Sequence, residues 1–223
     1  MKKVVFWLTL IVGIVALIGS CAKSEDSTTT ASTTASTTTS GDNTSITTTT
    51  PSGSITLGSY TMSGVYKSAC GTSAASYFIS AGAFPSDVQS YAFAFVVTGN
   101  DNVSMETHTY TDTGCTTSSY ISKLIRDNVT VGTASGANYP VTYNDQGFKL
   151  TVNTTTAETW LETLYANLGR TLDFTVGREM GVYPVSPTLT YGLWTPGATT
   201  IYLAAESDNS TPSTAGAIVY TKE

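Results

Sequence analysis

Three cysteines and one histidine are the side chains of this 223-residue chain best suited to covalent or acid–base chemistry. Cys21 lies near the amino terminus, Cys70 and Cys115 lie further along the chain, and the histidine is His108. A metal site needs several such ligands at close spacing. With one histidine and no closely spaced pair of cysteines, we predict no metal and no other cofactor.

His108 is the one histidine that could serve a serine nucleophile as its base. Such catalysis needs a histidine beside the serine and a third group that orients it. Glu106 and Tyr110 lie in phase with His108 on an expected strand, so the three share one face. We interpret this face as solvated and polar. Because the chain also lacks a Gly-x-Ser-x-Gly motif, we predict a protein that is not an enzyme and rank a hydrolase third.

The amino-terminal residues have the pattern of an export signal. Lys2 and Lys3 precede an apolar run over residues 4–20, which ends in the small residues Gly19 and Ser20. This order is typical of a secretory signal peptide. The run is at the lower limit of what spans a bilayer, and no basic flank follows it. We therefore expect residues 1–20 to be cleaved.

The cysteine that follows this run resembles the lipobox of bacterial lipoproteins. The resemblance rests on Leu17, Ile18, Gly19 and Ser20, directly before Cys21. It implies cleavage before Cys21 and attachment of diacylglycerol and palmitate to this residue. The protein would then have a membrane as its partner and would be attached to it through the acyl anchor. Within the same resemblance, Ala22 directly after the cysteine favours the outer membrane. The resemblance does not indicate which face of that membrane the protein occupies.

Cys70 and Cys115 remain as an even pair of cysteines in an oxidising compartment. We predict one disulfide between them, with two free thiols as the alternative. The bond would close a loop of about 45 residues, for which chain-entropy estimates give roughly 3–4 kcal/mol of stabilisation.

The segment from Cys21 to residue 54 is dominated by threonine and serine. Such a segment cannot bury enough apolar surface to offset the entropy of ordering it. We predict a disordered tether over residues 21–54, with a glycosylated stalk as the alternative function. The remaining residues, 55–223, have the length of one domain.

Hydrophobic residues in this domain alternate mostly with a period of two, which is typical of β-strands. The clearest example is residues 89–97, which is apolar on both faces and is therefore expected to be covered on both. Turn residues at 98–102, 144–147 and 195–198 predict three hairpins. The remaining expected strands are 64–69, 76–79, 103–111, 120–126, 128–132, 139–143, 148–153, 171–177, 188–194, 199–204 and 217–221, with 120–132 forming one bent strand or two.

One helix is expected between residues 155 and 169. Thr155 and Glu158 have the spacing of a capping box, and Gly169 is a suitable carboxyl-terminal stop. Trp160 and Leu164 belong to an apolar stripe at helical spacing. We predict that this stripe packs on the strands and covers the doubly apolar strand at 89–97.

About nine short strands and one helix predict a β-barrel or a β-sandwich. Three features of the domain resemble bacterial lipoproteins with a lipocalin-like domain. They are Gly-Val-Tyr at 64–66 with Cys70 after it, the turn at 110–115, and the closing pair at 191–194 and 201–203. The resemblance implies an all-β fold, namely an antiparallel barrel of about eight to ten strands.

The net charge and the aromatic content of the chain limit its possible functions. The formal net charge of −6 argues against nucleic acid as a partner. A protein core cannot easily provide hydrogen-bond partners for the hydroxyls of thirteen tyrosines. However, β-strands favour tyrosine in any case. We assign five aromatic residues to a candidate surface for a lipid or small apolar ligand: Tyr91, Phe93, Phe95, Tyr110 and Trp194. The alternative is a structural or host-contact surface lipoprotein whose barrel is filled and holds no ligand. In either case we expect a monomer.

Overall fold

The computed structural model describes residues 48–183 and 187–223 of the chain. The predicted signal peptide, Cys21 and most of the predicted tether lie outside these residues. The described part forms two helices and eleven strands. In chain order they are β1 (Ile55–Leu57), β2 (Tyr60–Met62), β3 (Val65–Lys67), α2 (Ala75–Ser80), β4 (Ser90–Val97), β5 (Val103–Tyr110), β6 (Ser118–Val131), β7 (Tyr139–Val152), α3 (Thr155–Asn167), β8 (Glu179–Val182), β9 (Thr188–Pro196), β10 (Thr200–Leu203) and β11 (Val219–Lys222).

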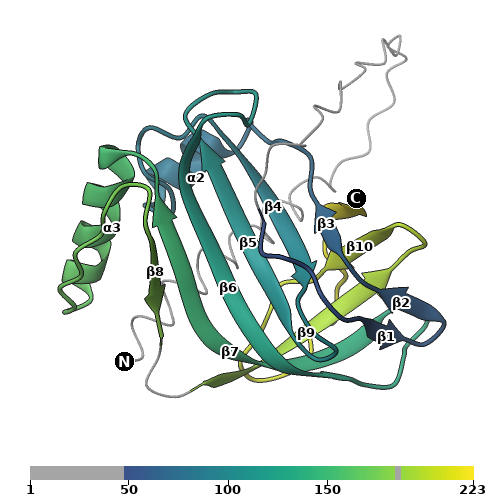
Figure 1. Ribbon diagram of the computed structural model, residues 1–223. Coiled ribbons are helices and arrows are strands. Elements are labelled where there is room, and N and C mark those ends of the chain that lie inside the picture. Colours follow the sequence, from purple (N-terminus) through teal and green to yellow (C-terminus); the bar gives the residue numbers. More distant parts are fainter. Residues whose placement is uncertain (1–47, 184–186) are drawn as a thin grey trace, which may run out of the picture.

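The fold is an antiparallel β-barrel of eight strands (Figure 1). The strand order is β6-β5-β4-β3-β11-β10-β9-β7, and pairing between β6 and β7 closes it. The predicted all-β barrel class is thus confirmed. β1 and β2 form a separate two-stranded sheet, which lies near β9 in the figure.

Strand β7 decides how far the barrel closes. Its first part, Tyr139 to Asp145, pairs with β9, whereas Phe148 to Thr151 pair with β8 instead. Both parts pair with β6 on the other edge. The strands β9, β10 and β11 therefore close one half of the barrel, and the other half opens toward β8.

Several predicted elements are confirmed. β4 and β5 form a hairpin around residues 98–102, and β9 and β10 form another around Gly197. Residues 118–131 are one bent strand, with irregular register near Asn128, whose φ is +53°. Helix α3 ends where Gly169 takes a φ of +75°. The predicted capping box of Thr155 and Glu158 is wrong by one residue, because the amino-terminal cap is Thr154, whose hydroxyl accepts a hydrogen bond from the Ala157 amide at 3.1 Å.

Three further predictions of local structure are wrong. Residues 144–147 are not a hairpin turn but part of the continuous strand β7, in which Gly147 has a φ of +121° and the register with β6 shifts. Residues 76–79 lie in helix α2 instead of a strand. Residues 171–177 form no strand, and Phe174 packs instead beside Tyr165 of α3.

The apolar side chains form separate clusters in the barrel. The largest fills the closed half and includes Phe95, Tyr143, Trp194 and Ile201. A second lies between α2 and Tyr91. A third joins α3 to β6, β7 and Phe174.

Helix α3 does not cover β4, contrary to the prediction. It packs on β6 and β7, because its buried residues Leu161 and Tyr165 meet Leu150 and Val152. The outward face of β4 is nevertheless buried, as expected for a doubly apolar strand. In the described part of the chain, no helix has both the length and the apolar character needed to cross a bilayer.

Candidate functional site

The register of four adjacent strands places inward-facing side chains in rows. Phe95, Val103 and Trp194 meet in the closed half, so residues in phase with them face the interior. One row runs from Phe93 through Thr107 and Ser122 to Leu150. The row nearer the closed half is Phe95, Met105, Leu124 and Phe148.

Half-buried side chains gather in the middle of this inward face. We call them the inner wall, and they are Tyr91, Phe93, Met105, Thr107, Ser122 and Phe148. Their outward neighbours on β5 are more deeply buried, with Glu106 at 2% and His108 at 1% relative exposure. In a barrel filled by its own side chains the inward residues are the most buried. The middle of β5 has the opposite order.

The inner wall combines aromatic, thioether and hydroxyl groups. Tyr91 packs on Phe93 with ring centroids 5.4 Å apart, and on Phe78 of α2 at 5.3 Å. Burial raises the pKa of the Tyr91 hydroxyl, so this group stays neutral at physiological pH. Thr107 and Ser122 add hydroxyls opposite one another on β5 and β6. Apolar surface with a few polar groups is typical of small-molecule sites.

The structure brings four of the five candidate ligand residues to the inward face. Tyr91 and Phe93 belong to the inner wall. Phe95 and Trp194 are packed edge to face in the closed half, with centroids 5.1 Å apart and relative exposures of 0% and 1%. The side chains of Phe95 and Trp194 pack at the end of the inner wall, and in this conformation they are not exposed to a ligand.

Tyr110 lies on the other face. It is in phase with His108, not with Thr107, and it packs against Ala92 and Cys115. Burial, with a further contribution from Asp112, raises the pKa of its hydroxyl. The structure therefore separates Tyr110 from the other four candidates.

The predicted disulfide is present between Cys70 and Cys115. With Tyr110 it covers Ala92 on the outward face of β4. The bond ties the segment after β3 to the turn after β5, and these two strands flank β4. It therefore supports the wall strands from outside.

A buried arginine, Arg126, lies in the row of inward-facing residues next to the inner wall, on the side of the closed half. Arg126 of β6 pairs with Val103 on one side and Asp145 on the other. Its Nε donates to Asp145 Oδ1 at 2.8 Å, and its two terminal nitrogens donate to the two carboxylate oxygens of Glu206. We call Arg126, Asp145, Glu206, Tyr143 and Thr190 the Arg126 cluster.

The remaining contacts of the Arg126 cluster hold its charges in place. The guanidinium carbon lies 4.4 Å from the centroid of the Tyr143 ring, a cation–π contact. Thr190 donates to Asp145 Oδ2 at 3.1 Å. Burial alone would lower the pKa of Arg126, but the Glu206 carboxylate raises it well above its ordinary value. Burial raises the pKa of Tyr143, so this hydroxyl is neutral.

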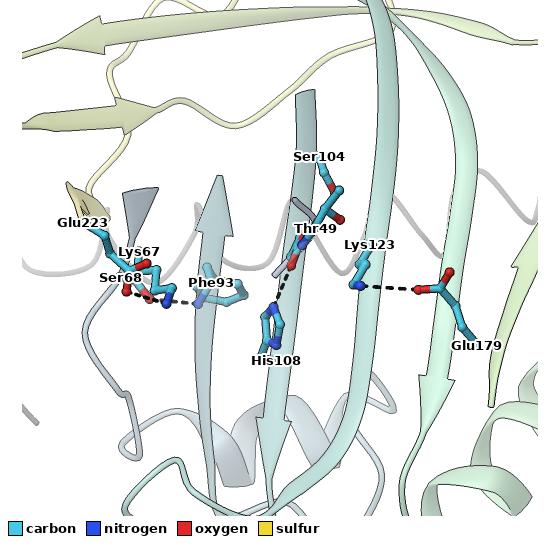
Figure 2. Close-up of polar contacts among 10 residues, drawn as sticks. Thr49, Lys67, Ser68, Phe93, Ser104, His108, Lys123, Glu179 and Glu223 are labelled. Atoms are coloured by element: carbon cyan, nitrogen blue, oxygen red, sulfur yellow. Dashed lines mark hydrogen bonds and ion pairs between the residues drawn. The ribbon is translucent and has the colours of Figure 1, made fainter. Parts of the chain in front are cut away.

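A second polar cluster lies on the outward face of β5 (Figure 2). Glu106 Oε2 lies 2.9 Å from His108 Nε2, while Glu106 Oε1 accepts from the Ser104 hydroxyl at 3.2 Å and from the Thr49 amide at 2.9 Å. Burial alone would raise the pKa of Glu106. The hydrogen bonds from His108 and Thr49 outweigh it and lower the pKa below 4.5.

The shared face predicted for Glu106, His108 and Tyr110 is confirmed, but it is buried and not solvated. The order of contacts does not suit a serine nucleophile. Ser104 bonds to Glu106, and Glu106 lies between Ser104 and His108. A catalytic triad instead requires the histidine to accept the proton of the serine.

Sequence reasoning missed the Arg126 cluster. The available signal was Arg126 itself, a charged residue in phase with Leu124 within an expected strand. Its partners Asp145 and Glu206 lie 19 and 80 residues away, so spacing could not identify them.

Comparison of the chain with known protein families gives no match, and comparison with curated protein sequences gives none either.

Proposed function

We propose that this protein is an exported lipoprotein, anchored in the outer membrane through Cys21, whose barrel binds a small apolar ligand without catalysis. The inner wall is the binding surface. The observation that carries the proposal is the reversed burial along β5, where inward Met105 and Thr107 are half-buried while outward Glu106 and His108 are buried. Half-buried apolar groups on a concave face gain free energy when a ligand covers them.

The flanking structure also supports ligand binding. Packed clusters lie on both sides of the inner wall, one in the closed half and the others at α2 and α3. Because these clusters pack against the wall strands, the surface is formed before a ligand arrives, and such preorganisation lowers the entropy that binding would cost. The domain is proposed to act as a monomer.

A second candidate function is a structural or host-contact protein with a filled barrel. It is favoured by the closed half, where Phe95, Tyr143 and Trp194 are almost fully buried against one another. This packing leaves no room for a ligand at that level. The two candidates differ in what they predict for the inner wall.

Two threonine-to-tryptophan variants separate the candidates. Thr107→Trp fills the inner wall, whereas Thr151→Trp makes the same change at a half-buried position that faces outward on β7. Binding is followed by the fluorescence of the neutral probe N-phenyl-1-naphthylamine added to the full-length protein. We expect Thr107→Trp to weaken binding about tenfold or more, equivalent to at least about 1.4 kcal/mol, and Thr151→Trp to leave it unchanged.

Ser122→Phe, on the neighbouring strand, is a second wall variant in case Thr107→Trp does not fold. Circular dichroism and thermal unfolding establish that each variant is folded. Ligand binding is contradicted if the wild-type protein shows no saturable probe fluorescence, or if wall and outward variants weaken binding equally. The first of these results favours the filled barrel.

The anchor is tested separately at Cys21. Cys21→Ala removes the thiol that would carry the diacylglycerol group, so incorporation of labelled palmitate should cease and the protein should leave the membrane fraction. The Cys70→Ala/Cys115→Ala double variant is the control, because it removes the two disulfide-bonded cysteines of the barrel and leaves Cys21 in place, so labelling should remain intact. Labelling that persists in Cys21→Ala would contradict the anchor.

A further inference from the structure

The Arg126 cluster carries more negative than positive charge. It contains one guanidinium and the two carboxylates of Asp145 and Glu206, which gives a formal charge of −1. Four of the five guanidinium N–H groups have partners, because Nη1 also contacts the sulfur of Met105. The arginine is thus neutralised by groups of the chain itself.

This cluster adjoins the inner wall. Arg126 follows Leu124 by two residues on the inward face, and its contact with Met105 reaches into the next row. The Glu206 side chain is 7% exposed and that of Asp145 is 28% exposed. A ligand that lies on the wall and extends toward the closed half therefore meets a surface with excess negative charge.

The lysines of β3, β6 and β7 do not offset this charge, because they face outward. Lys67 of β3 pairs with Glu223, and Lys123 of β6 pairs with Glu179 at 3.3 Å (Figure 2). Lys149 of β7 also faces Glu179, at 3.7 Å. The polar groups that the inner wall itself offers are the neutral hydroxyls of Tyr91, Thr107 and Ser122.

From these charges we infer that the ligand is an uncharged amphiphile, such as a fatty alcohol or a monoacylglycerol, and not a fatty acid anion. The inference rests on the proposed function and names the ligand class of that same inner wall. An ionised carboxylate would lose its hydration and meet like charge, whereas a hydroxyl head can exchange hydrogen bonds with Thr107 and Ser122. The compensated arginine discriminates against anions, even though an unpaired arginine would attract them.

Displacement of the neutral probe by matched ligands tests the inference. Dodecanol, monododecanoyl glycerol and dodecanoate share one chain length and differ in their head group. At about pH 8, where dodecanoate is ionised, we expect the two neutral ligands to displace the probe from the full-length protein at roughly tenfold lower concentration than dodecanoate.

Variants that each remove one charge then test whether the Arg126 cluster causes the preference for neutral ligands. Glu206→Gln and Asp145→Asn each remove one negative charge from the Arg126 cluster. Each should improve dodecanoate binding about tenfold while leaving dodecanol binding unchanged. Asp208→Asn makes the same charge change at an exposed site two residues from Glu206 and should alter neither. The use of two variants covers the case in which one does not fold.

The outcomes separate the two proposals. Dodecanoate binding to the wild-type protein as tightly as dodecanol would overturn the inference and leave the proposed function standing. An unchanged preference in both folded charge variants would also overturn it. If neither the probe nor any of the three ligands binds, the proposed function fails and the inference fails with it.

Discussion

The Arg126 guanidinium donates to both carboxylate oxygens of Glu206, a residue 80 positions later in the chain, inside the barrel. This pair joins β6 to the segment that follows β10 across the interior. With Asp145 of β7 as the third member, it links three parts of the barrel at the level where the closed half begins. The contact therefore has consequences for both stability and binding.

Replacing the buried arginine should strongly destabilise the barrel. Arg126→Met leaves Glu206 and Asp145 without their cation, and breaking a buried ion pair in this way costs about 3–5 kcal/mol. Arg170→Met is the matched control, because Arg170 is half-buried and its guanidinium carbon lies 5.6 Å from the Tyr165 ring. It should cost less than about 1 kcal/mol.

Urea unfolding of the two variants measures the difference. Adding Glu206→Gln to Arg126→Met removes one of the uncompensated charges and should recover part of the loss. An Arg126→Met protein as stable as the wild type would show that the cluster contributes nothing to the fold.

Glu106 should make the stability of the protein depend on pH in the acid range. Its pKa in the folded state is lowered below the ordinary value of 4.5. The carboxylate therefore stabilises the fold fully above pH 4.5, and this contribution is lost as the pH falls through the lowered pKa. Glu106→Gln should cost about 1.5–3 kcal/mol near neutral pH and flatten the acid decline.

Urea unfolding at a series of pH values between roughly 6 and 3 measures this effect. Asp173→Asn, at an exposed position after α3, is the control and should decline in parallel with the wild type. Parallel curves for Glu106→Gln and the wild type would mean that the Glu106 carboxylate is not the group responsible.

The disulfide should contribute to stability through the loop that it closes. Cys70 and Cys115 are 45 residues apart, and a loop of that length corresponds to about 3–4 kcal/mol in the chain-entropy model. We expect a reducing agent to lower the melting temperature of the wild type to that of the Cys70→Ser/Cys115→Ser double variant. The double variant itself should not respond to the reducing agent. A wild-type melting temperature that reduction leaves unchanged would count against the predicted contribution.

The parts of the fold that sequence could predict are those fixed by local signals. The hairpins at 98–102 and 195–198 follow from turn residues between alternating strands, and α3 follows from its apolar spacing and Gly169. The Cys70–Cys115 bond follows from the even pair of cysteines that remains if Cys21 is used by the predicted anchor. For the hairpins and the helix the neighbouring residues alone favour one structure, whereas the disulfide follows from the number of cysteines.

The errors occur where the same local signal serves more than one structure. Residues 144–147 carry turn chemistry, yet Asp145 is held inside β7 by Arg126 and Thr190, and Gly147 accommodates the register shift. Residues 76–79 favour a strand by composition, but Phe78 is buried in a helix against Phe84 and Tyr91. Contacts between distant segments decide both structures.

The candidate site was predictable only in part for the same reason. Alternation placed Tyr91, Phe93 and Phe95 on one face of β4, and the structure confirms that shared face. The inward position of Arg126 and the outward position of Tyr110 depend on the register of β5 with its neighbours. A register shift between Thr109 and Tyr110 is not visible in the sequence.

The most direct measurement of ligand binding at the inner wall is a methyl NMR titration of protein labelled at its methionines. Met105 is half-buried on the inner wall, whereas Met62 is buried in the closed half. Addition of dodecanol should shift the Met105 methyl resonance saturably, at the concentrations that displace the probe, and leave Met62 unchanged. Saturable dodecanol binding without a change at Met105 would contradict binding at the inner wall.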